Sequence, residues 1–564
     1  MRTRGWILRG LLLALGAGRI LSACGADSSG NSPGGGGGVG TDASPGQSRD
    51  SGAGGAVDVG APPLPPEVEE RRSFELPQAG ARFVYVANPR RDTVAVIDSR
   101  TLAIQTVEAG DGPTHVATLP GRDVALVINV NAQSLSILRT GEGGTATSQL
   151  PIVRGANAIE VAPDGAHAVV WLDTNRPNQG VPAGSFQDVT LLTLTEGMER
   201  AVQLSVGFRP LDVVFSQDGS AAFVVTEDGI SILRFADITG PTIVPSVSLG
   251  HDGSLPPPDA GTPDAGTPDA GLPPTEREAR LLDVGVTPDG RYAIARVEGS
   301  RFLRLVDLQA RRVELLDAGG AITDVDLAAD GRTALVVVRE RSQVLRVPVP
   351  GGFADPTMVN RLDLPGELVG SVTASPDGRR ALLYTTAAAV ERVTLLDLMG
   401  TAPPAVIRLR KTVRAVAFSP DGRAALIVHG RTAGSPADPT IDLETRIDRS
   451  YGFTLIDTAT RFAKLQLTPA EVGPFALSAD GEYAFVVLRD DPARVALVER
   501  IVLRSFEVHD IALGSPPTSV GSISATRRAF VGQDHPEGRI TFIDEATGAL
   551  QSVTGFELNS RIVE

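Results

Sequence analysis

Three aspartates stand at one repeated position of this chain and could together hold a cation or an amine. Asp212, Asp283 and Asp324 each lie seven residues before a glycine that ends a turn, whereas neighbouring units have Ala, Ser or Pro there. If the repeated position faces a common opening, the three carboxylates would line one arc of it. The alternative is structural, because an aspartate can also cap the start of a strand through its own backbone.

Six histidines could supply acid, base or metal chemistry, but they show no metal-ligand spacing. They stand at positions 115, 167, 251, 429, 509 and 535. We expect His115 at the mouth of the opening, and the neighbours His509 and Asp510 could act as an acid or a base. Nucleophile elbows, phosphate-binding glycine loops and haem-attachment motifs are absent from the sequence. We therefore predict no metal, no cofactor and no catalytic residue.

The elements that must position these residues repeat along the chain. Nine apolar runs each lead to a tight turn that ends in glycine, at Gly80, Gly121, Gly165, Gly219, Gly290, Gly331, Gly378, Gly422 and Gly481. Between them lie short runs rich in Val, Ile, Thr and Phe, separated by residues that favour turns. A period of roughly 40 to 50 residues built from short strands is typical of a β-propeller.

The strand count predicts an all-β fold, a β-propeller of about ten four-stranded blades. Eight or nine blades with one unit unravelled, and two smaller rings, remain alternatives. The first strand that the repeat pattern identifies begins at Phe83 and has the position of strand two in its blade. The inner strand of the first blade must therefore come from another part of the chain. We expect residues 560–564 to supply it, so that N- and C-terminal segments close the ring and leave no exposed edge.

Two recurrent aspartates have a structural explanation. Four of the nine glycine turns read Pro-Asp-Gly, at residues 163–165, 288–290, 376–378 and 420–422, and three others keep Asp-Gly. Proline presets φ, aspartate can bond the backbone two residues on, and glycine takes the positive φ that reverses the chain. A second aspartate ends another strand of several units, as Asp98 and Asp457 do, where it can fix the following hairpin.

The first unit resembles the YVTN-type β-propeller repeats of bacterial and archaeal surface and periplasmic proteins. Residues 85–88 read YVAN, residues 93–98 read TVAVID and residues 112–117 read GPTHVA, in the order that these repeats follow. The resemblance spans residues 80 to 564. It implies a fold but no particular activity, because the broader group includes sugar-lactone hydrolases, haem-carrying domains and proteins that only bind.

The N-terminus resembles a bacterial lipoprotein signal. Basic residues precede an apolar run, and Leu21-Ser22-Ala23-Cys24 resembles the lipobox, in which the cysteine sulfur is acylated and cleavage leaves the cysteine first. Cys24 is the only cysteine, so the mature chain cannot form an internal disulfide. Residue 25 is glycine rather than the aspartate that retains many lipoproteins in the inner membrane, which favours the outer membrane of a bacterial cell envelope.

These observations divide the chain into three parts. Residues 1–23 are the predicted signal peptide, residues 24–72 form a flexible tether rich in Gly, Ser and Pro, and residues 73–564 form the propeller. A low-complexity insertion at 251–275, built on repeats of Pro-Asp-Ala-Gly, is expected to be disordered.

The net charge of the chain argues against nucleic acid as a partner. The formal net charge is −15, and loss of residues 1–23 removes four arginines and no acid, so the mature chain is even more negative and nucleic acid is excluded as a partner.

The long insertions indicate which face of the propeller could bind a ligand. In propeller topology the insertions 173–187, 251–275 and 430–451 fall on the face whose loops connect strand two to strand three and strand four to strand one. Function tends to lie on variable loops held by a rigid frame. This face, with His115, Asp212, Asp283 and Asp324, is therefore the candidate binding surface.

The function that fits these features is a lipid-anchored binding or scaffolding platform of the cell envelope. Its partners would be the membrane, through lipid on Cys24, and a protein, glycan or small ligand, and we expect a monomer. The alternative is a propeller hydrolase that resembles sugar lactonases. Such an enzyme needs convergent His, Glu or Arg side chains at the mouth of the opening.

Overall fold

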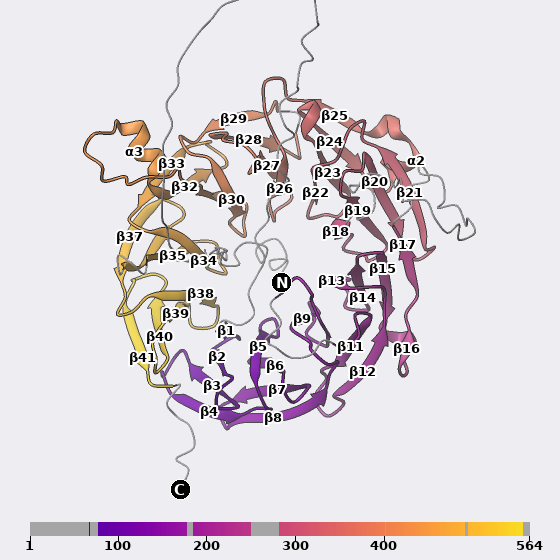
Figure 1. Cartoon of the computed structure of the whole chain (residues 1–564), viewed down its shortest axis with the longest axis vertical. Helices are drawn as coiled ribbons and strands as arrows, with labels where there is room; N and C mark the ends of the chain where they lie inside the picture. Colours follow the sequence, from indigo (N-terminus) through magenta and orange to yellow (C-terminus); the bar gives the residue numbers. More distant parts are fainter. Residues whose placement is uncertain are drawn as a thin grey trace, which may run out of the picture. The chain divides into compact units, whose positions relative to one another are not determined.

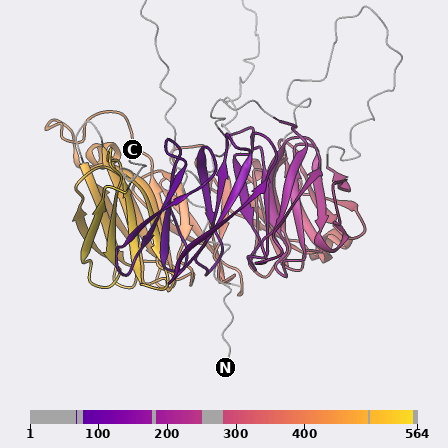
Figure 2. The same ribbon diagram turned by 90° about the horizontal axis from the view of Figure 1, so that it is seen from below.

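The computed structural model describes residues 67, 77–176, 184–249, 281–400, 402–490 and 495–556. Their strands form ten sheets, each built on four antiparallel strands, around a central opening, which confirms the prediction of a ten-bladed β-propeller (Figure 1). Figure 2 shows the ring from its side, with the strands running between its two faces. Blade 1 is the sheet that contains β1, and the blades are numbered in chain order.

In every blade the chain moves outward from the centre through four strands. The inner strands are β1 (Gln78–Ala79), β5 (Pro113–Thr118), β9 (Ala158–Val161), β13 (Pro210–Phe215), β18 (Leu281–Val286), β22 (Asp324–Leu327), β26 (Ser371–Ala374), β30 (Val413–Phe418), β34 (Glu471–Leu477) and β38 (Pro517–Ile523). The second strands are β2 (Phe83–Asn88), β6 (Val124–Asn129), β10 (His167–Trp171), β14 (Ala221–Thr226), β19 (Tyr292–Val297), β23 (Thr333–Val338), β27 (Arg380–Tyr384), β31 (Ala424–His429), β35 (Tyr483–Asp490) and β39 (Arg528–Gln533).

The two outer positions of each blade are equally regular. The third strands are β3 (Thr93–Asp98), β7 (Ser134–Gly141), β11 (Asp188–Thr193), β15 (Gly229–Arg234), β20 (Phe302–Asp307), β24 (Gln343–Pro348), β28 (Arg392–Asp397), β32 (Tyr451–Asp457), β36 (Val495–Val502) and β40 (Arg539–Asp544). The fourth are β4 (Ile104–Glu108), β8 (Gly144–Pro151), β12 (Arg200–Ser205), β17 (Ser246–Ser248), β21 (Arg312–Asp317), β25 (Asn360–Asp363), β29 (Ala405–Arg408), β33 (Ala463–Thr468), β37 (Glu507–Ala512) and β41 (Leu550–Thr554).

Few other elements interrupt this pattern. A short strand, β16 (Thr242–Ile243), adds to blade 3 in parallel with β12. The described helices are α2 (Gly351–Ala354) and α3 (Leu443–Arg449), with 3₁₀ turns η1 (Phe235–Asp237), η2 (Arg339–Arg341) and η3 (Pro356–Met358). No helix in the described part of the chain is long and apolar enough to cross a membrane.

The hydrophobic core is divided among the interfaces between blades. The described residues form ten clusters of buried apolar side chains, and each cluster joins two successive blades. Because both faces of a blade are covered, its strands can be apolar throughout, as at residues 334–338, which are all fully buried. Ten blades in an open row would have nine interfaces, so the tenth cluster shows that the ring is closed.

Closure occurs where the N-terminal and C-terminal blades meet. Val84 and Ile97 of blade 1 pack with Phe530 and Phe542 of blade 10 in one cluster. The Ser99 hydroxyl also lies 2.9 Å from that of Thr526. The first and last blades are therefore neighbours, and neither eight blades nor two smaller rings describe the fold.

The source of the first inner strand differs from the prediction. β1 lies immediately before Phe83 and pairs with β2, so blade 1 is complete without the segment 560–564, which lies outside the described residues. β1 has only two residues, too few for a sequence period to reveal it. Its turn includes Gly80, where a Cβ atom would come within 2.8 Å of the carbonyl oxygen of Arg122 in blade 2.

The Asp-Gly turns have the structural role that was predicted. In blade 8, the Ser419 hydroxyl donates to Oδ1 of Asp421 at 2.7 Å and accepts the N–H of Ala424 at 2.9 Å. The same carboxylate oxygen accepts the N–H of Arg423 at 3.1 Å, and Gly422 has a φ of 68°. Equivalent hydroxyl–carboxylate bonds join Ser216 to Asp218, Thr287 to Asp289, Ser375 to Asp377 and Ser478 to Asp480.

One insertion is more ordered than its composition indicates. The charges of residues 430–451 favour a solvated loop, but this insertion contains α3, whose Ile447 is buried. Asp442 caps the helix by accepting the N–H of Thr445, and Lys411 donates to the carbonyl oxygen of Ile447 at 2.7 Å. The predicted disordered insertion at 251–275 lies outside the described residues.

Candidate functional site

The four residues selected from the sequence all lie on inner strands. His115 is on β5, Asp212 on β13, Asp283 on β18 and Asp324 on β22. The three aspartates therefore belong to three successive blades, as their repeated position indicates. The predicted lipidation site, Cys24, lies outside the described residues.

Protein groups bind the carboxylates of these aspartates. Asp283 Oδ2 lies 2.6 Å from Nε of Arg296, on the next strand of the same blade. Asp324 is buried, and its Oδ2 accepts the N–H of Val372 in blade 7 at 2.6 Å. Asp212 is exposed and bonds the next backbone N–H. These contacts favour the structural explanation, and no three His, Cys, Asp or Glu side chains in the described ranges could hold a metal ion together.

Asp326 is an inner-strand carboxylate that the sequence analysis missed. Its Oδ2 accepts the N–H of Ala374 at 2.7 Å, just as Asp324 accepts that of Val372, so two carboxylates of β22 fasten blade 6 to blade 7. Burial raises the pKa of Asp326 to about 6, and the negative charge of Asp283 adds to the effect. The alternation Asp-Val-Asp at 324–326 is the sequence signal for this pair.

The candidate acid–base histidines do not meet. His115 is buried rather than open to solvent, and its Nδ1 lies 2.7 Å from the hydroxyl oxygen of Thr114. His509 is on β37, the outer strand of blade 9, where its Nε2 lies 3.4 Å from Glu507. Inner and outer strands occupy opposite edges of a blade, so these histidines cannot form one site.

A groove lies between blades 7 and 8. It has a volume of about 400 Å³ and adjoins a second hollow of about 500 Å³. Blade 7 contributes Arg379, Arg380, Leu395, Leu396, Asp397, Met399, Ala402, Pro403 and Ala405, and blade 8 contributes Thr458, Ala459 and Arg461. The groove opens on the face of the Asp-Gly turns, opposite the face of the long insertions that the sequence analysis favoured.

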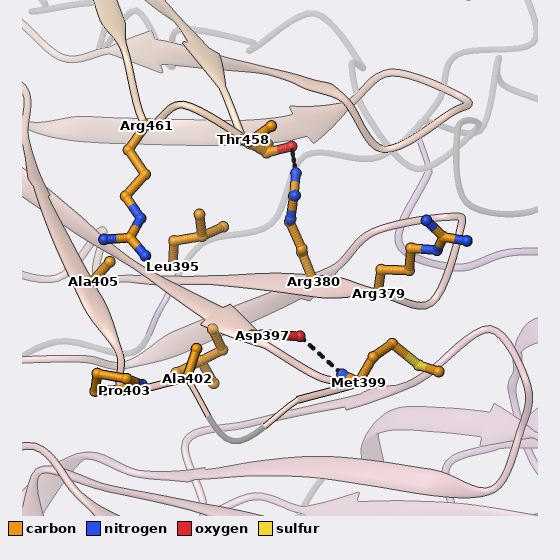
Figure 3. Close-up of a pocket in the computed structure, with 12 residues that line it drawn as sticks. Arg379, Arg380, Leu395, Asp397, Met399, Ala402, Pro403, Ala405, Thr458 and Arg461 are labelled. Carbon is orange, nitrogen blue, oxygen red and sulfur yellow. Dashed lines mark hydrogen bonds between the residues drawn. The ribbon is translucent and has the colours of Figure 1, made fainter.

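The arginines of this groove are placed by the turns. Arg379 and Arg380 follow the turn glycine of blade 7, whereas Arg461 belongs to the turn that joins β32 to β33. Figure 3 shows the side chains of Arg380 and Arg461 extending into the same space from opposite sides. Arg380 donates a hydrogen bond to the hydroxyl of Thr458. Among the described residues, the guanidinium groups of Arg379 and Arg461 make no hydrogen bond or ion pair.

The acidic side chains near these arginines are already held by the backbone. Asp397 accepts the N–H groups of Met399 and Gly400, each at 3.0 Å. Asp457 likewise accepts two N–H groups of its own turn, at 2.9 and 2.7 Å. These carboxylates keep their charge, but neither forms an ion pair with Arg379 or Arg461, so these two guanidinium groups can bind an external anion.

An apolar wall completes the groove. Leu395 and Leu396, which are 6 % and 1 % exposed, are among the residues that line it, and Met399 adds a side chain that is 77 % exposed. Guanidinium groups bind carboxylate or phosphate through paired N–H donors, while the wall can cover an aliphatic segment. The arrangement suits a ligand that carries acidic groups beside apolar ones.

No protein-family profile and no characterised protein sequence matches this chain. Among solved structures, a eukaryotic initiation factor is 12 % identical, with 77 % of this chain and 96 % of that chain covered and a TM-score of 0.50. The dihydro-haem d1 dehydrogenase NirN is 16 % identical over 70 % of this chain and 76 % of its own, with a TM-score of 0.41. The hydrazine synthase of Kuenenia stuttgartiensis is 14 % identical over 61 % and 95 %, with a TM-score of 0.33. At such identities the likeness concerns the fold alone.

Proposed function

We propose that this protein is a monomeric, lipid-anchored platform of the bacterial cell envelope that binds an acidic protein segment in the groove between blades 7 and 8. The observation that supports the binding role is the pair Arg379 and Arg461. Both are exposed and lack a partner among the described residues, and they stand beside an apolar wall.

The negative charge of the whole chain makes this group of arginines more significant for binding an acidic ligand. Its formal net charge is −15, so most acidic ligands are repelled, and only a local group of arginines can hold one. Each charge-assisted hydrogen bond to a guanidinium contributes about 1.5–3 kcal/mol when water is excluded. A segment that alternates acidic and apolar side chains would meet both the arginines and the wall.

The proposed location in the cell envelope is based on the amino-acid sequence. The likeness of residues 1–24 to a lipoprotein signal and of residues 80–564 to YVTN-type repeats supports an envelope protein held by lipid on Cys24. Glycine at position 25 supports the outer membrane. The tether 24–72 would let the propeller stand off the lipid by a few tens of Å, at about 5–6 Å times the square root of its length.

Calorimetric titration with a defined probe tests the groove. The probe is a capped pentapeptide of alternating leucine and glutamate, and its glutamine counterpart is the negative control. We expect the protein to bind the glutamate peptide, and the double variant Arg379→Ala/Arg461→Ala to bind it at least about tenfold more weakly, since two charged hydrogen-bond donors are lost.

A matched variant separates the groove from general charge. Arg90→Ala/Arg154→Ala removes two exposed arginines, in blade 1 and between blades 2 and 3, and should leave the affinity unchanged. An equal loss in both double variants, or binding of the glutamine peptide with the same affinity, would contradict the proposal.

A further inference from the structure

The face opposite the groove contains a second site, in which blades 6 and 7 bind the carboxylate of Glu67. Oε1 accepts hydrogen bonds from Nη1 of Arg339 and from the hydroxyl of Thr385, both at 2.9 Å. Oε2 accepts the backbone N–H and the hydroxyl of Thr386, both at 2.6 Å. Only 7 % of the Glu67 side chain is exposed. We call the residues Arg339, Gly370, Thr385 and Thr386 the carboxylate cradle.

The blades position every donor of the cradle. Arg339 begins η2 directly after β23, and the two threonines follow β27, so the donors lie on strand-two-to-three connections of neighbouring blades. The hydroxyl of Thr385 accepts the N–H of Ala387 at 3.2 Å, which leaves its proton free to point at the carboxylate. Donors that are oriented before the ligand arrives favour tight binding.

Gly370 provides the space for the carboxylate. A Cβ atom built on this glycine would lie 1.8 Å from Oε1 of Glu67, so any other residue would occupy the position of the ligand. The glycine precedes β26, on a connection of strand four to strand one. The cradle therefore lies on the face that the sequence analysis selected as the binding surface, although none of its residues was among those selected.

The bound carboxylate comes from outside the blades. Glu67 is 272 residues from Arg339 and 318 from Thr385 along the chain, and it precedes the first strand of blade 1. The N–H of Ala387 orients the Thr385 hydroxyl without any contribution from Glu67. An independent glutamate could make the same four hydrogen bonds in its place.

We propose that the cradle is a binding site for the glutamate side chain of a partner protein, and that Glu67 fills it until the partner displaces it. This site is separate from the groove between blades 7 and 8, and it does not depend on the function proposed for that groove. The ligand class follows from the donor set, because one guanidinium, two hydroxyls and one backbone N–H match the two oxygens of a carboxylate. A neutral amide would offer its N–H₂ group to at least one donor.

Competition by Glu67 should lower the apparent affinity of the cradle for a free glutamate side chain. A ligand attached to the same chain acts at an effective concentration in the millimolar range. A free glutamate side chain must overcome this competitor, so the natural chain should bind it weakly. Replacing Glu67 by alanine removes the competitor and leaves the donors in place.

Titration with N-acetyl-glutamate N-methylamide, followed by calorimetry and thermal unfolding, tests the proposal. We expect the full-length variant Glu67→Ala to bind this probe at least about tenfold more tightly than the natural chain does, and to unfold at a higher temperature when the probe is present. The corresponding glutamine compound should not bind. Adding Gly370→Ala to Glu67→Ala should abolish binding, because the new methyl group takes the place of the carboxylate.

Two further variants make the outcome decisive. Arg339→Gln in the Glu67→Ala chain should also abolish binding. This variant still tests the cradle if Gly370→Ala prevents folding. Arg90→Ala/Arg154→Ala in the same chain, which removes two exposed arginines outside both sites, should leave the affinity unchanged and so excludes an effect of general charge. Equal affinity of the natural chain and Glu67→Ala for the probe, or unchanged binding after Arg339→Gln, would overturn the proposal.

Discussion

Exchange of residues 1–24 for a plain cleavable secretory signal followed by serine is expected to move the protein from the membrane fraction to the soluble periplasmic fraction. Each buried methylene of an acyl chain contributes about 0.8 kcal/mol, and stable anchoring needs more than one such signal. The mature surface provides no substitute, because a net negative charge is repelled by anionic headgroups. We therefore expect a nearly complete shift, measured by cell fractionation and immunoblotting.

A conservative change within the lipobox is the matched control. Ser22→Ala keeps Cys24 and the natural signal, and it should leave the protein with the membrane. Whole replacement of the signal is preferred to Cys24→Ser alone, because an uncleaved signal peptide would itself bind the membrane. If the exchanged chain still fractionates with membranes, lipid on Cys24 is not the anchor.

Glu499→Gln is expected to stabilise the protein at pH 8 and to have little effect at pH 5. Glu499 on β36 is 1 % exposed, and its Oε2 has no hydrogen-bond partner. Burial, followed by the nearby charge of Asp510, raises the pKa of Glu499 to about 7. In the unfolded chain its pKa returns to about 4.3. The folded state therefore binds the extra proton between these values, and stability falls as pH rises through this window.

The size of this effect follows from the same pKa difference. A shift of between two and three pKa units corresponds to roughly 3 kcal/mol of lost stability above pH 7. Glutamine avoids this loss, but its amide must still find partners, which costs about 1–3 kcal/mol if it fails. We expect the stability difference between variant and natural chain to change by about 2–3 kcal/mol from pH 5 to pH 8, measured by denaturant unfolding.

The comparison between the two chains isolates Glu499. Burial lowers the pKa of His429 to about 4, so this histidine reduces stability as pH falls below 6.5, but it does so equally in both chains and cancels. Glu507→Gln is the control, since the Glu507 side chain is 63 % exposed on the neighbouring strand. Parallel pH profiles for Glu499→Gln and the natural chain would show that Glu499 is ionised in the folded protein.

The repeating part of the fold was predictable because each blade uses the same local chemistry. The hydroxyl, aspartate and glycine of a turn such as 419–422 act within a few residues, so the sequence shows them directly. Strands that are covered on both faces are continuous apolar runs, which can also be recognised in the sequence. The inner strand β1 could not be found in this way, because two residues have no period and its partners are supplied by the neighbouring strand and the last blade.

The candidate sites were harder to predict because their parts come from different blades. Arg379 and Arg380 directly follow a turn glycine, and this adjacency is a usable signal, but Arg461 joins them only through blade packing. Glu67 meets Arg339 across 272 residues, and no spacing rule connects them. The aspartates at 283 and 324 had a visible period, yet their partners Arg296 and Val372 depend on the neighbouring strand and blade.

The central claim is that ten blades form one closed ring in which blade 1 packs on blade 10. The hydroxyl oxygens of Ser99 and Thr526 lie 2.9 Å apart although 427 residues separate them, so cysteines at these positions should form a disulfide. In a chain without Cys24, mild oxidation of Ser99→Cys/Thr526→Cys should give an intramolecular crosslink, seen by non-reducing electrophoresis and mass spectrometry. Ser99→Cys/Ser220→Cys, with the second cysteine in blade 4, should stay reduced. A chain that gives no crosslink at 99 and 526, or only crosslinked dimers, would contradict the closed ring.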